Sequence, residues 1–208
     1  RNGNAPQVIG SPRVAFGGGV YLVAWVEDGA VLATRVGADG ALLDSQPIAV
    51  ASAPGARELA AVASDGTQFL VVWSDIASTV FLPGLGDLHA ARVTAEGVLL
   101  DGPASGPGIL VRSEPSASRR DVTAGFAGGH FVLAWAIDGY APPTGIYAVR
   151  ISPAGTLLDA SALEVAHNRA VHPAVAPAPD GATFLAWVGS TEAGGTTTKD
   201  LEAAWIAW

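Results

Sequence analysis

The stretch Tyr21-Leu22-Val23-Ala24-Trp25 decides how this chain folds, because close copies of it return three times. The copies are Phe69-Leu70-Val71-Val72-Trp73, Phe131-Val132-Leu133-Ala134-Trp135 and the one-residue-shorter Phe184-Leu185-Ala186-Trp187. Their tryptophans are 48, 62 and 52 residues apart (25 to 73, 73 to 135, 135 to 187). A period of about 50 residues indicates a repeat protein.

Each copy lies in the same series of short strands. In the first repeat, Arg13–Phe16 is followed by a glycine turn at 17–19 and the tryptophan strand, then by Val31–Val36, a turn at 38–40 and Gln46–Val50. Gly-Gly and Asp-Gly between apolar runs favour hairpins because they tolerate positive φ. Four short strands in about 50 residues are typical of a β-propeller blade.

The tryptophan strand is apolar at every position, so we expect both of its faces to be buried between neighbouring blades. The strand before it is rich in small residues, among them Ala15, Ala61, Ala124, Gly125 and Ala174. Small side chains suit innermost strands, which approach one another closely near the axis of a propeller.

We therefore predict an all-β, four-bladed β-propeller that forms a single domain over residues 1–208. Its blades cover 11–50, 58–111, 121–166 and 173–208. The last blade lacks a closing strand, and Ala5–Gly10 resembles Ser45–Val50, so we expect residues 5–10 to complete it and leave no open edge. The alternatives are four units of a longer propeller, two chains that close one eight-bladed ring, and an open β-sandwich.

Composition narrows the classes of partner. The net charge is −8 with Lys199 as the only lysine, which argues against nucleic acid or an anionic membrane as the main partner. The chain has no cysteine, which removes disulfides, zinc thiolate sites and thiol catalysis. No apolar run reaches the roughly 18 residues that cross a bilayer, so we expect no membrane insertion.

An arginine and an aspartate nine residues apart recur in three repeats, as Arg35/Asp44, Arg92/Asp101 and Arg150/Asp159. The fourth repeat lacks both partners and has Trp205 in place of the arginine. This joint presence and absence predicts a structural cross-strand ion pair, not a catalytic one.

The repeats differ most in the loops that follow the tryptophan strand, at Ser74–Asp87, Asp138–Gly145 and Gly189–Asp200. By strand direction these loops share one end of the sheets with the connections between blades, and function usually lies in variable loops on a rigid scaffold. The candidate ligand-binding residues at this end are Asp28, Asp75, Asp87, His89, Asp138, Tyr140, His167 and His172.

Carboxylates arranged around an axis could bind a hard cation or sugar hydroxyls, so an ion in the central channel is one expectation, and the sequence does not identify a cofactor beyond it. An exposed aromatic such as Tyr140 could stack on a sugar or anchor a peptide. The alternatives are that the aspartates cap turns and that His167 and His172 are surface histidines instead of metal ligands.

The repeat pattern of aromatic-Leu-Val-Ala-Trp, Ala-x-Arg-Val and Gly-x-x-Leu-Asp resembles the repeats of secreted or surface propeller-like proteins of bacteria. The size of the chain and its predicted blade count are similar to those of hemopexin-like four-bladed propellers, which bind proteins or haem and often hold ions in the channel. The sequence pattern of hemopexin blades is missing, so the likeness carries over no binding residues. The resemblance implies an extracytoplasmic or secreted bacterial protein.

The chain contains no Gly-x-Ser-x-Gly, His-Glu-x-x-His, phosphate-binding or EF-hand motif. We therefore predict a non-catalytic propeller that binds a protein or a glycan through its variable loops, as a monomer or as a module of a larger protein. One alternative is a carbohydrate-active hydrolase or lyase that uses Asp75, Asp87, Asp138 or a histidine, since the two carboxylates of a glycosidase can be distant in sequence. The other is a purely structural adhesion module.

Overall fold

The computed structural model describes residues 11–52, 56–76, 86–102, 108–113, 119–137, 144–167, 170–178, 181–193, 196–206 and 208. These residues form strands and turns and contain no helix. No helix in this part of the chain is therefore long and apolar enough to span a membrane.

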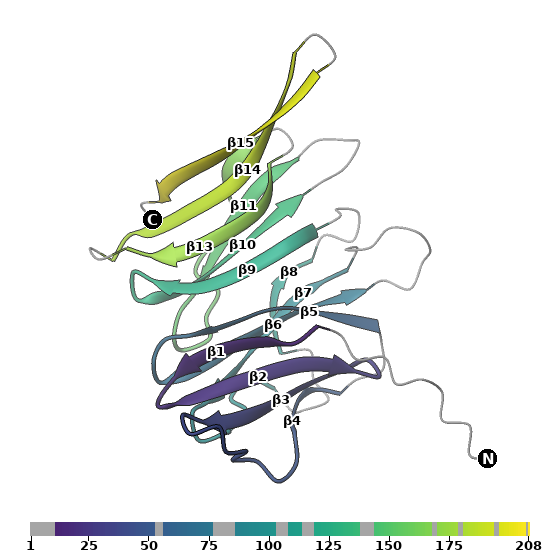
Figure 1. The fold of residues 1–208 in the computed structure, drawn as a ribbon, viewed down its shortest axis with the longest axis vertical. Helices are drawn as coiled ribbons and strands as arrows, with labels where there is room; N and C mark the ends of the chain where they lie inside the picture. Colours follow the sequence, from purple (N-terminus) through teal and green to yellow (C-terminus); the bar gives the residue numbers. More distant parts are fainter. Residues whose placement is uncertain are drawn as a thin grey trace, which may run out of the picture. The chain divides into compact units, whose positions relative to one another are not determined.

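The strands form four antiparallel sheets (Figure 1). The first sheet contains β1 (Arg13–Gly17), β2 (Val20–Glu27), β3 (Ala30–Gly37) and β4 (Ile48–Ala51), and the second β5 (Ala56–Ser64), β6 (Gln68–Ile76), β7 (Leu88–Thr94) and β8 (Ile109–Arg112). The third contains β9 (Arg119–Ala127), β10 (His130–Ile137), β11 (Gly145–Ile151) and β12 (Leu163–His167), and the fourth β13 (Val171–Pro177), β14 (Thr183–Ala193) and β15 (Thr196–Ile206). The chain divides into two compact units, one with β1–β8 and one with β9–β15.

The prediction of an all-β chain built from antiparallel sheets is confirmed for the described residues, and three of the four sheets have four strands there. Within each sheet the strands follow one another in chain order, as the hairpin signals indicated. The strand proposed to complete the last blade falls on residues 5–10, which lie outside the described residues. The closed ring of four blades and the single domain therefore stay predictions.

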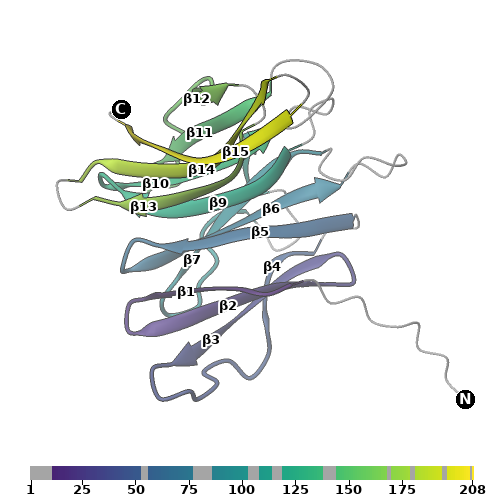
Figure 2. The ribbon, with the colours of Figure 1, turned by 45° about the horizontal axis from the view of Figure 1, so that its top comes forward.

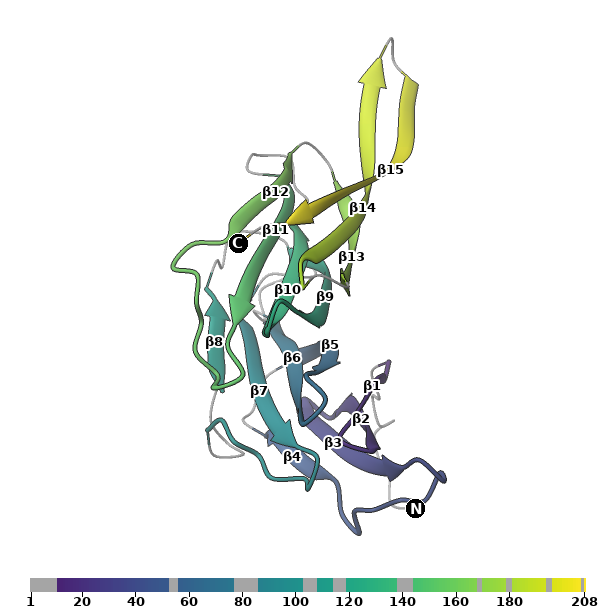
Figure 3. The same ribbon diagram turned by 90° about the vertical axis from the view of Figure 1, so that its left-hand side faces the viewer.

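The prediction of a loop at Gly189–Asp200 is wrong. β14 and β15 continue to pair through this stretch, from Gly189 opposite Asp200 to Ala193 opposite Thr196. Figure 3 shows the resulting hairpin reaching well beyond β13. β-branched threonines favour extended backbone, and the hydroxyls of Thr191 and Thr198 lie 2.6 Å apart across the two strands.

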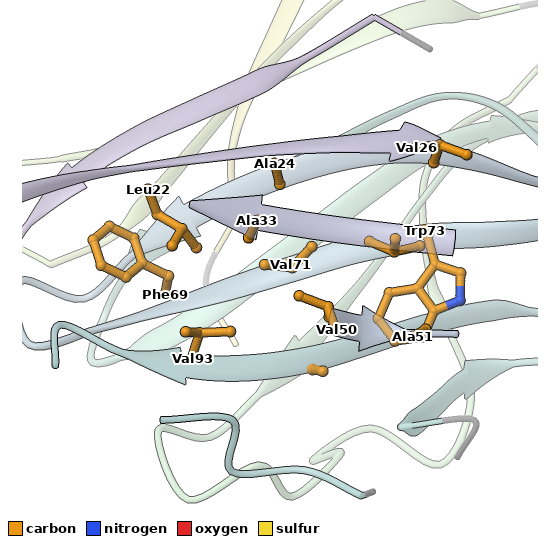
Figure 4. Packing of buried hydrophobic residues seen from close by; sticks show 12 residues of the cluster. Leu22, Ala24, Val26, Ala33, Val50, Ala51, Phe69, Val71, Trp73 and Val93 are labelled. Atoms are coloured by element: carbon orange, nitrogen blue, oxygen red, sulfur yellow. The ribbon is translucent and has the colours of Figure 1, made fainter. Parts of the chain in front are cut away.

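The core of the β1–β8 unit lies between the first and second sheets (Figure 4). We call the face of each sheet that carries the repeated tryptophan its front face, and the opposite face its back face. Leu22, Ala24 and Val26 on the back face of the first sheet pack with Phe69, Val71 and Trp73 on the front face of the second. Period-2 alternation along β2 and β6 places these two sets of side chains toward each other.

Burial of both faces is confirmed for two of the tryptophan strands. Every residue of β6 from Phe69 to Trp73 is buried, and so is every residue of β10 from Phe131 to Ile137. For β2 the prediction is wrong, because only its back-face residues are buried and Tyr21 on the front face is 40% exposed. The first sheet therefore has an apolar front face that is left partly open to solvent.

The three predicted ion pairs are confirmed, and each joins the third strand of a sheet to the segment that follows it. The guanidinium Nη2 lies 2.6 Å from the carboxylate in Arg35–Asp44, 2.8 Å in Arg92–Asp101 and 2.7 Å in Arg150–Asp159. Each arginine also donates its backbone N–H to the same carboxylate. The side chains are mostly buried, so these pairs hold the closing hairpins of the first three sheets more firmly than a surface pair would.

Asp44 and Asp159 make the stability of the fold depend on pH. Hydrogen bonds from the side chains of Arg35 and Arg150 lower the pKa of these two carboxyls from the ordinary value. A carboxyl whose pKa is lowered by folding contributes its full stabilisation above the unfolded pKa of about 4, and loses it as the pH falls through the folded pKa. We expect the urea midpoint of unfolding to fall as the pH drops below about 4.

The Asp44→Asn variant is the control for this effect. It should have a lower urea midpoint than the wild type at about pH 7 and a smaller further loss at about pH 3, because asparagine does not titrate. Parallel pH profiles for the two proteins would contradict the assignment to this pair.

Candidate functional site

The long-loop end is defined here as the end of each sheet where its second strand passes to its third and where its first strand begins. Six of the eight predicted site residues lie at this end of their own sheets: Asp28, Asp75, Asp87, His89, His167 and His172. Asp138 and Tyr140 lie outside the described residues. The second sheet brings three of the predicted residues together, namely Asp75, Asp87 and His89.

Asp75, near the C-terminal end of β6, is the centre of this group. Its carboxylate accepts a hydrogen bond of 2.8 Å from Nε of Arg57, and its second oxygen lies 3.4 Å from Nε2 of His89. The Arg57 side chain is only 4% exposed, whereas that of Asp75 is 41% exposed. A buried cation therefore holds a carboxylate that remains accessible to solvent.

Arg57 is fixed from two sides. It lies directly opposite Asp75 in the register of β5 and β6, and its Nη1 donates a hydrogen bond of 2.8 Å to the carbonyl of Gly29 in the turn between β2 and β3. One guanidinium thus joins the first sheet to the second at the long-loop end. Its planar donors suit this double role, which a lysine could not fill in the same way.

Asp87 lies beside Asp75 across the sheet. The Asp75 N–H donates a hydrogen bond of 2.9 Å to the Asp87 carbonyl, which continues the register in which Ser74 is opposite Leu88. Residues directly opposite in an antiparallel pair direct their side chains to the same face of the sheet, with Cβ atoms about 5 Å apart. Asp75 and Asp87 are therefore a cross-strand pair of acidic residues, and Asp75 is the member of the pair that contacts Arg57.

His89 lies under this pair, opposite Trp73, and its ring stacks on the indole with the ring centroids 5.8 Å apart. The residue is 5% exposed. Its Nδ1 is one of two buried side-chain polar atoms with no hydrogen-bond partner among the described residues. Because packing fixes the imidazole plane, Nε2 is directed at the carboxylate of Asp75.

The acidic pair occurs in the second sheet alone among the described residues. The residue two places after the tryptophan is Glu27, Ile137 or Gly189 in the other sheets. The tryptophan has Leu32, Tyr147 or Glu202 opposite it where the second sheet has His89. Glu27 and Glu202 accept hydrogen bonds from the indoles of Trp25 and Trp187, which is a structural role. The arrangement of Asp75, Asp87 and His89 thus occurs in one repeat, with a hydrogen-bond pattern that differs from the other repeats. Such an arrangement is a better candidate for function than a feature that all repeats share.

Asp28 fits the alternative that it shapes a turn. It has φ of 50° and precedes Gly29 with φ of 81°, and the two residues connect the paired ends of β2 and β3. Positive φ at both central positions is the geometry of a two-residue type I′ hairpin, which Asp-Gly favours. Its side chain is exposed at the tip of the turn.

The two other histidines among the predicted site residues, His167 and His172, each contact an acidic residue in the β9–β15 unit. Nδ1 of His172 lies 2.9 Å from Asp121, and both residues have positive φ. They are on β9 and β13, which lie side by side (Figure 2). Nδ1 of His167 lies 2.7 Å from Glu164 on the same strand. Both histidine side chains are well exposed, as the surface alternative expected.

Sequence reasoning missed Arg57, Asp121 and Glu164. Arg57 lies in a stretch read as a connection between blades, although counting antiparallel pairs back from the turn at Asp65-Gly66 would have placed it opposite Asp75. Register shifts in β9 and β13 near Asp121 and His172 follow no sequence signal that we can identify. No group of three histidine, aspartate or glutamate side chains suited to a metal ion lies in the described part of the chain.

No protein-family model and no curated protein matches this sequence. Similar solved structures include a thermostable family-43 glycoside hydrolase, with a TM-score of 0.51 and 14% identity over 99% of this chain and 93% of that one. Others are the xylan β-1,4-xylosidase of Bacillus halodurans C-125 (TM-score 0.51, 16% identity, 98% of this chain and 41% of that one) and the exo-β-1,3-galactanase of Phanerochaete chrysosporium (0.54, 13%, 99% and 50%). The chain thus spans half or less of the length of these last two.

At these identities the likeness concerns the fold, which is β-propeller-like and all-β. The prediction of a non-catalytic binding propeller is corrected by these comparisons, because the similar structures are glycoside hydrolases. The resemblance to hemopexin-like propellers stays an expectation from size and blade count.

Proposed function

We propose that this protein is a carbohydrate-active enzyme that hydrolyses a glycosidic bond, with its reacting groups at the long-loop end of the second sheet. The observation that carries the proposal is the cross-strand pair Asp75 and Asp87 at the long-loop end of the second sheet, in which a buried arginine holds Asp75. Glycoside hydrolysis requires two carboxyl groups that flank the bond to be broken. The glycoside hydrolase neighbours support the same class of reaction.

The two acidic residues take different parts in this proposal. One carboxyl gives its proton to the departing sugar oxygen. The other either takes a proton from the attacking water or attacks the anomeric carbon itself, and in the second case water, deprotonated by the first residue, then hydrolyses the glycosyl-enzyme bond. Asp75 is the better candidate for the second part, since the guanidinium of Arg57 lies against it and compensates its negative charge. Asp87 is then the proton donor.

Arg57 and His89 are positioning residues in this arrangement. Both are nearly buried and contact Asp75 from different strands, so they restrict the directions in which its carboxylate can turn. Holding a reacting group in a productive geometry is a large part of enzymatic rate enhancement. We therefore propose a glycan as the partner of this protein. We also propose an extracytoplasmic location, because that is where the protein would encounter polysaccharides.

The proposal is tested by release of reducing ends from a panel of xylans, arabinans and galactans and from aryl glycosides of the matching sugars. We expect the wild type to turn over at least one class, and Asp75→Asn and Asp87→Asn each to lose that activity. Asp200→Asn is the matched control, because Asp200 is an exposed aspartate on β15. No turnover across the panel, or equal turnover by all three variants, would contradict the proposed function.

The fourth sheet is the part of the structure that bears on the predicted closing strand. Among the described residues no strand pairs with the outer edge of β15, whereas each of the other sheets has a fourth strand in that place. We propose that residues 5–10 supply this strand, as the similarity of Ala5–Gly10 to Ser45–Val50 suggests. An open edge of this length would otherwise be prone to pair with other chains.

A further inference from the structure

The turn between β2 and β3 lies beside Asp75. Arg57 donates one hydrogen bond of 2.8 Å from Nε to the Asp75 carboxylate and another of 2.8 Å from Nη1 to the Gly29 carbonyl. Both acceptors are therefore neighbours of one planar guanidinium, and the Arg57 side chain is only 4% exposed. This contact lies within the β1–β8 unit, so it fixes the position of the turn relative to the candidate site.

Asp28 directly precedes Gly29 at the tip of this turn. β2 and β3 stay paired up to Glu27 and Ala30, so the turn consists of two residues and the strands fix both of its ends. Asp28 is exposed at this tip. The backbone thus presents an exposed carboxylate next to Asp75, the residue that we propose to react.

The carboxylate of Asp28 takes no part in shaping its turn. In two other turns of the same unit, Asp39 accepts a hydrogen bond from the Ala41 N–H and Asp65 accepts one from the Thr67 N–H. Within the described part of the chain no hydrogen bond or ion pair engages the Asp28 carboxylate. Positive φ explains a choice among aspartate, asparagine and glycine at position 28, but it does not explain a charge there.

A negative charge at this position is also unfavourable for stability. Asp75 and Asp87 already lie at the same end of the unit, and like charges that are close together repel one another. Asparagine or glycine would form the same turn without adding a third negative charge. A residue that departs from the choice best for folding, with no structural gain in return, is a candidate for contact with a ligand.

We propose that Asp28 binds hydroxyl groups of the glycan substrate, at the sugar next to the bond that is broken at Asp75 and Asp87. This inference rests on the proposed function. Carboxylates accept short, charge-assisted hydrogen bonds, and two adjacent hydroxyls of one sugar ring can donate to the two oxygens of one carboxylate. Asp28 is therefore a substrate-binding residue that selects sugars with two neighbouring free hydroxyls, and it takes no part in bond cleavage.

Initial rates on the most active substrate of the panel test this inference with Asp28→Gly and Asp28→Asn, because both residues suit positive φ. Asp28→Gly should raise KM about 10-fold, since charge-assisted hydrogen bonds to the sugar are lost. It should keep kcat within about two-fold of the wild type, because this contact is the same in the ground state and the transition state. Asp28→Asn should raise KM less, since its amide oxygen still accepts a hydrogen bond.

Asp39→Asn is the matched control, because Asp39 is an exposed aspartate in the turn at the opposite end of the first sheet. Its asparagine can still accept the hydrogen bond from Ala41, so neither KM nor kcat should change. The urea midpoints of all three variants should stay close to that of the wild type. This measurement separates loss of binding from loss of the turn.

Three results would overturn the inference and leave the proposed function standing, provided that the wild type turns over a glycan. They are an unchanged KM in Asp28→Gly, a fall in kcat as large as that of Asp75→Asn, and a raised KM that is accompanied by a clearly lower urea midpoint. A wild type that turns over no substrate of the panel would overturn the inference and the proposed function together.

Discussion

Asp75→Asn should lower kcat by about 10³-fold on the most active substrate of the polysaccharide panel, with KM changed only a few-fold. Asparagine has nearly the shape of aspartate and can still accept a hydrogen bond from Arg57, so substrate binding should be largely kept. It can neither take a proton nor attack the anomeric carbon. The expected loss therefore lies in the chemical step, which initial rates at several substrate concentrations measure.

Two further measurements make this result specific to Asp75. Asp200→Asn should keep kcat within about two-fold of the wild type, since surface substitutions remote from a site have small effects. The unfolding midpoint of Asp75→Asn should show that the variant is folded at the assay temperature, although Arg57 has lost its charge partner. A folded Asp75→Asn enzyme with wild-type kcat would remove Asp75 from the reaction.

Leu22→Ala should destabilise the protein by about 3 kcal/mol, because it removes a fully buried side chain from the core between the first and second sheets. The substitution removes three carbon atoms that make contacts in the core. The two packed sheets leave little room for neighbouring side chains to move into the cavity that results. Urea unfolding followed by tryptophan fluorescence gives the free energy of unfolding.

Leu42→Ala is the matched control for this substitution. Leu42 is 73% exposed in the segment after β3, so the same change should cost no more than about 0.5 kcal/mol. Equal losses for the two variants would contradict the assignment of the repeated stretch to the core.

The repeated stretch and the glycine turns were enough to predict the strands and their order in the first three sheets. Both signals are local: apolar runs define the strands, and Gly-Gly or Asp-Gly defines the hairpins between them. The Arg–Asp pairs could also be predicted, because a fixed separation across one hairpin places both partners in contact. Local sequence carries this information without knowledge of the remaining fold.

The features that the sequence did not predict depend on contacts between distant segments. Whether a face of β2 is buried depends on the segment that packs against it, and the apolar pattern of β2 does not identify that segment. The extension of the β14–β15 hairpin required a register between strands joined by Gly194-Gly195, in a stretch that looked like a variable loop. Both cases show that a periodic pattern limits the structure of a strand but does not identify its neighbours.

The candidate site was predicted in part. Asp75, Asp87 and His89 were identified from their places after and before strands, and the structure brings them to one end of one sheet. Arg57 could not be assigned a role, because its importance comes from contacts with Asp75 on the neighbouring strand and with Gly29 in another sheet. The turn role of Asp28 likewise follows from its backbone conformation.

Amide hydrogen exchange of the Asp75→Asn protein, with and without an oligosaccharide from the active substrate class, tests the location of the site most directly. A glycan bound at the long-loop end of the second sheet should slow exchange in residues 56–58, 74–76 and 86–89, which surround Asp75 and Asp87. Residues 37–41, in the turn after β3 at the opposite end of the first sheet, should be unaffected. Protection confined to other segments, with no change around Asp75, would contradict a carbohydrate site at this position.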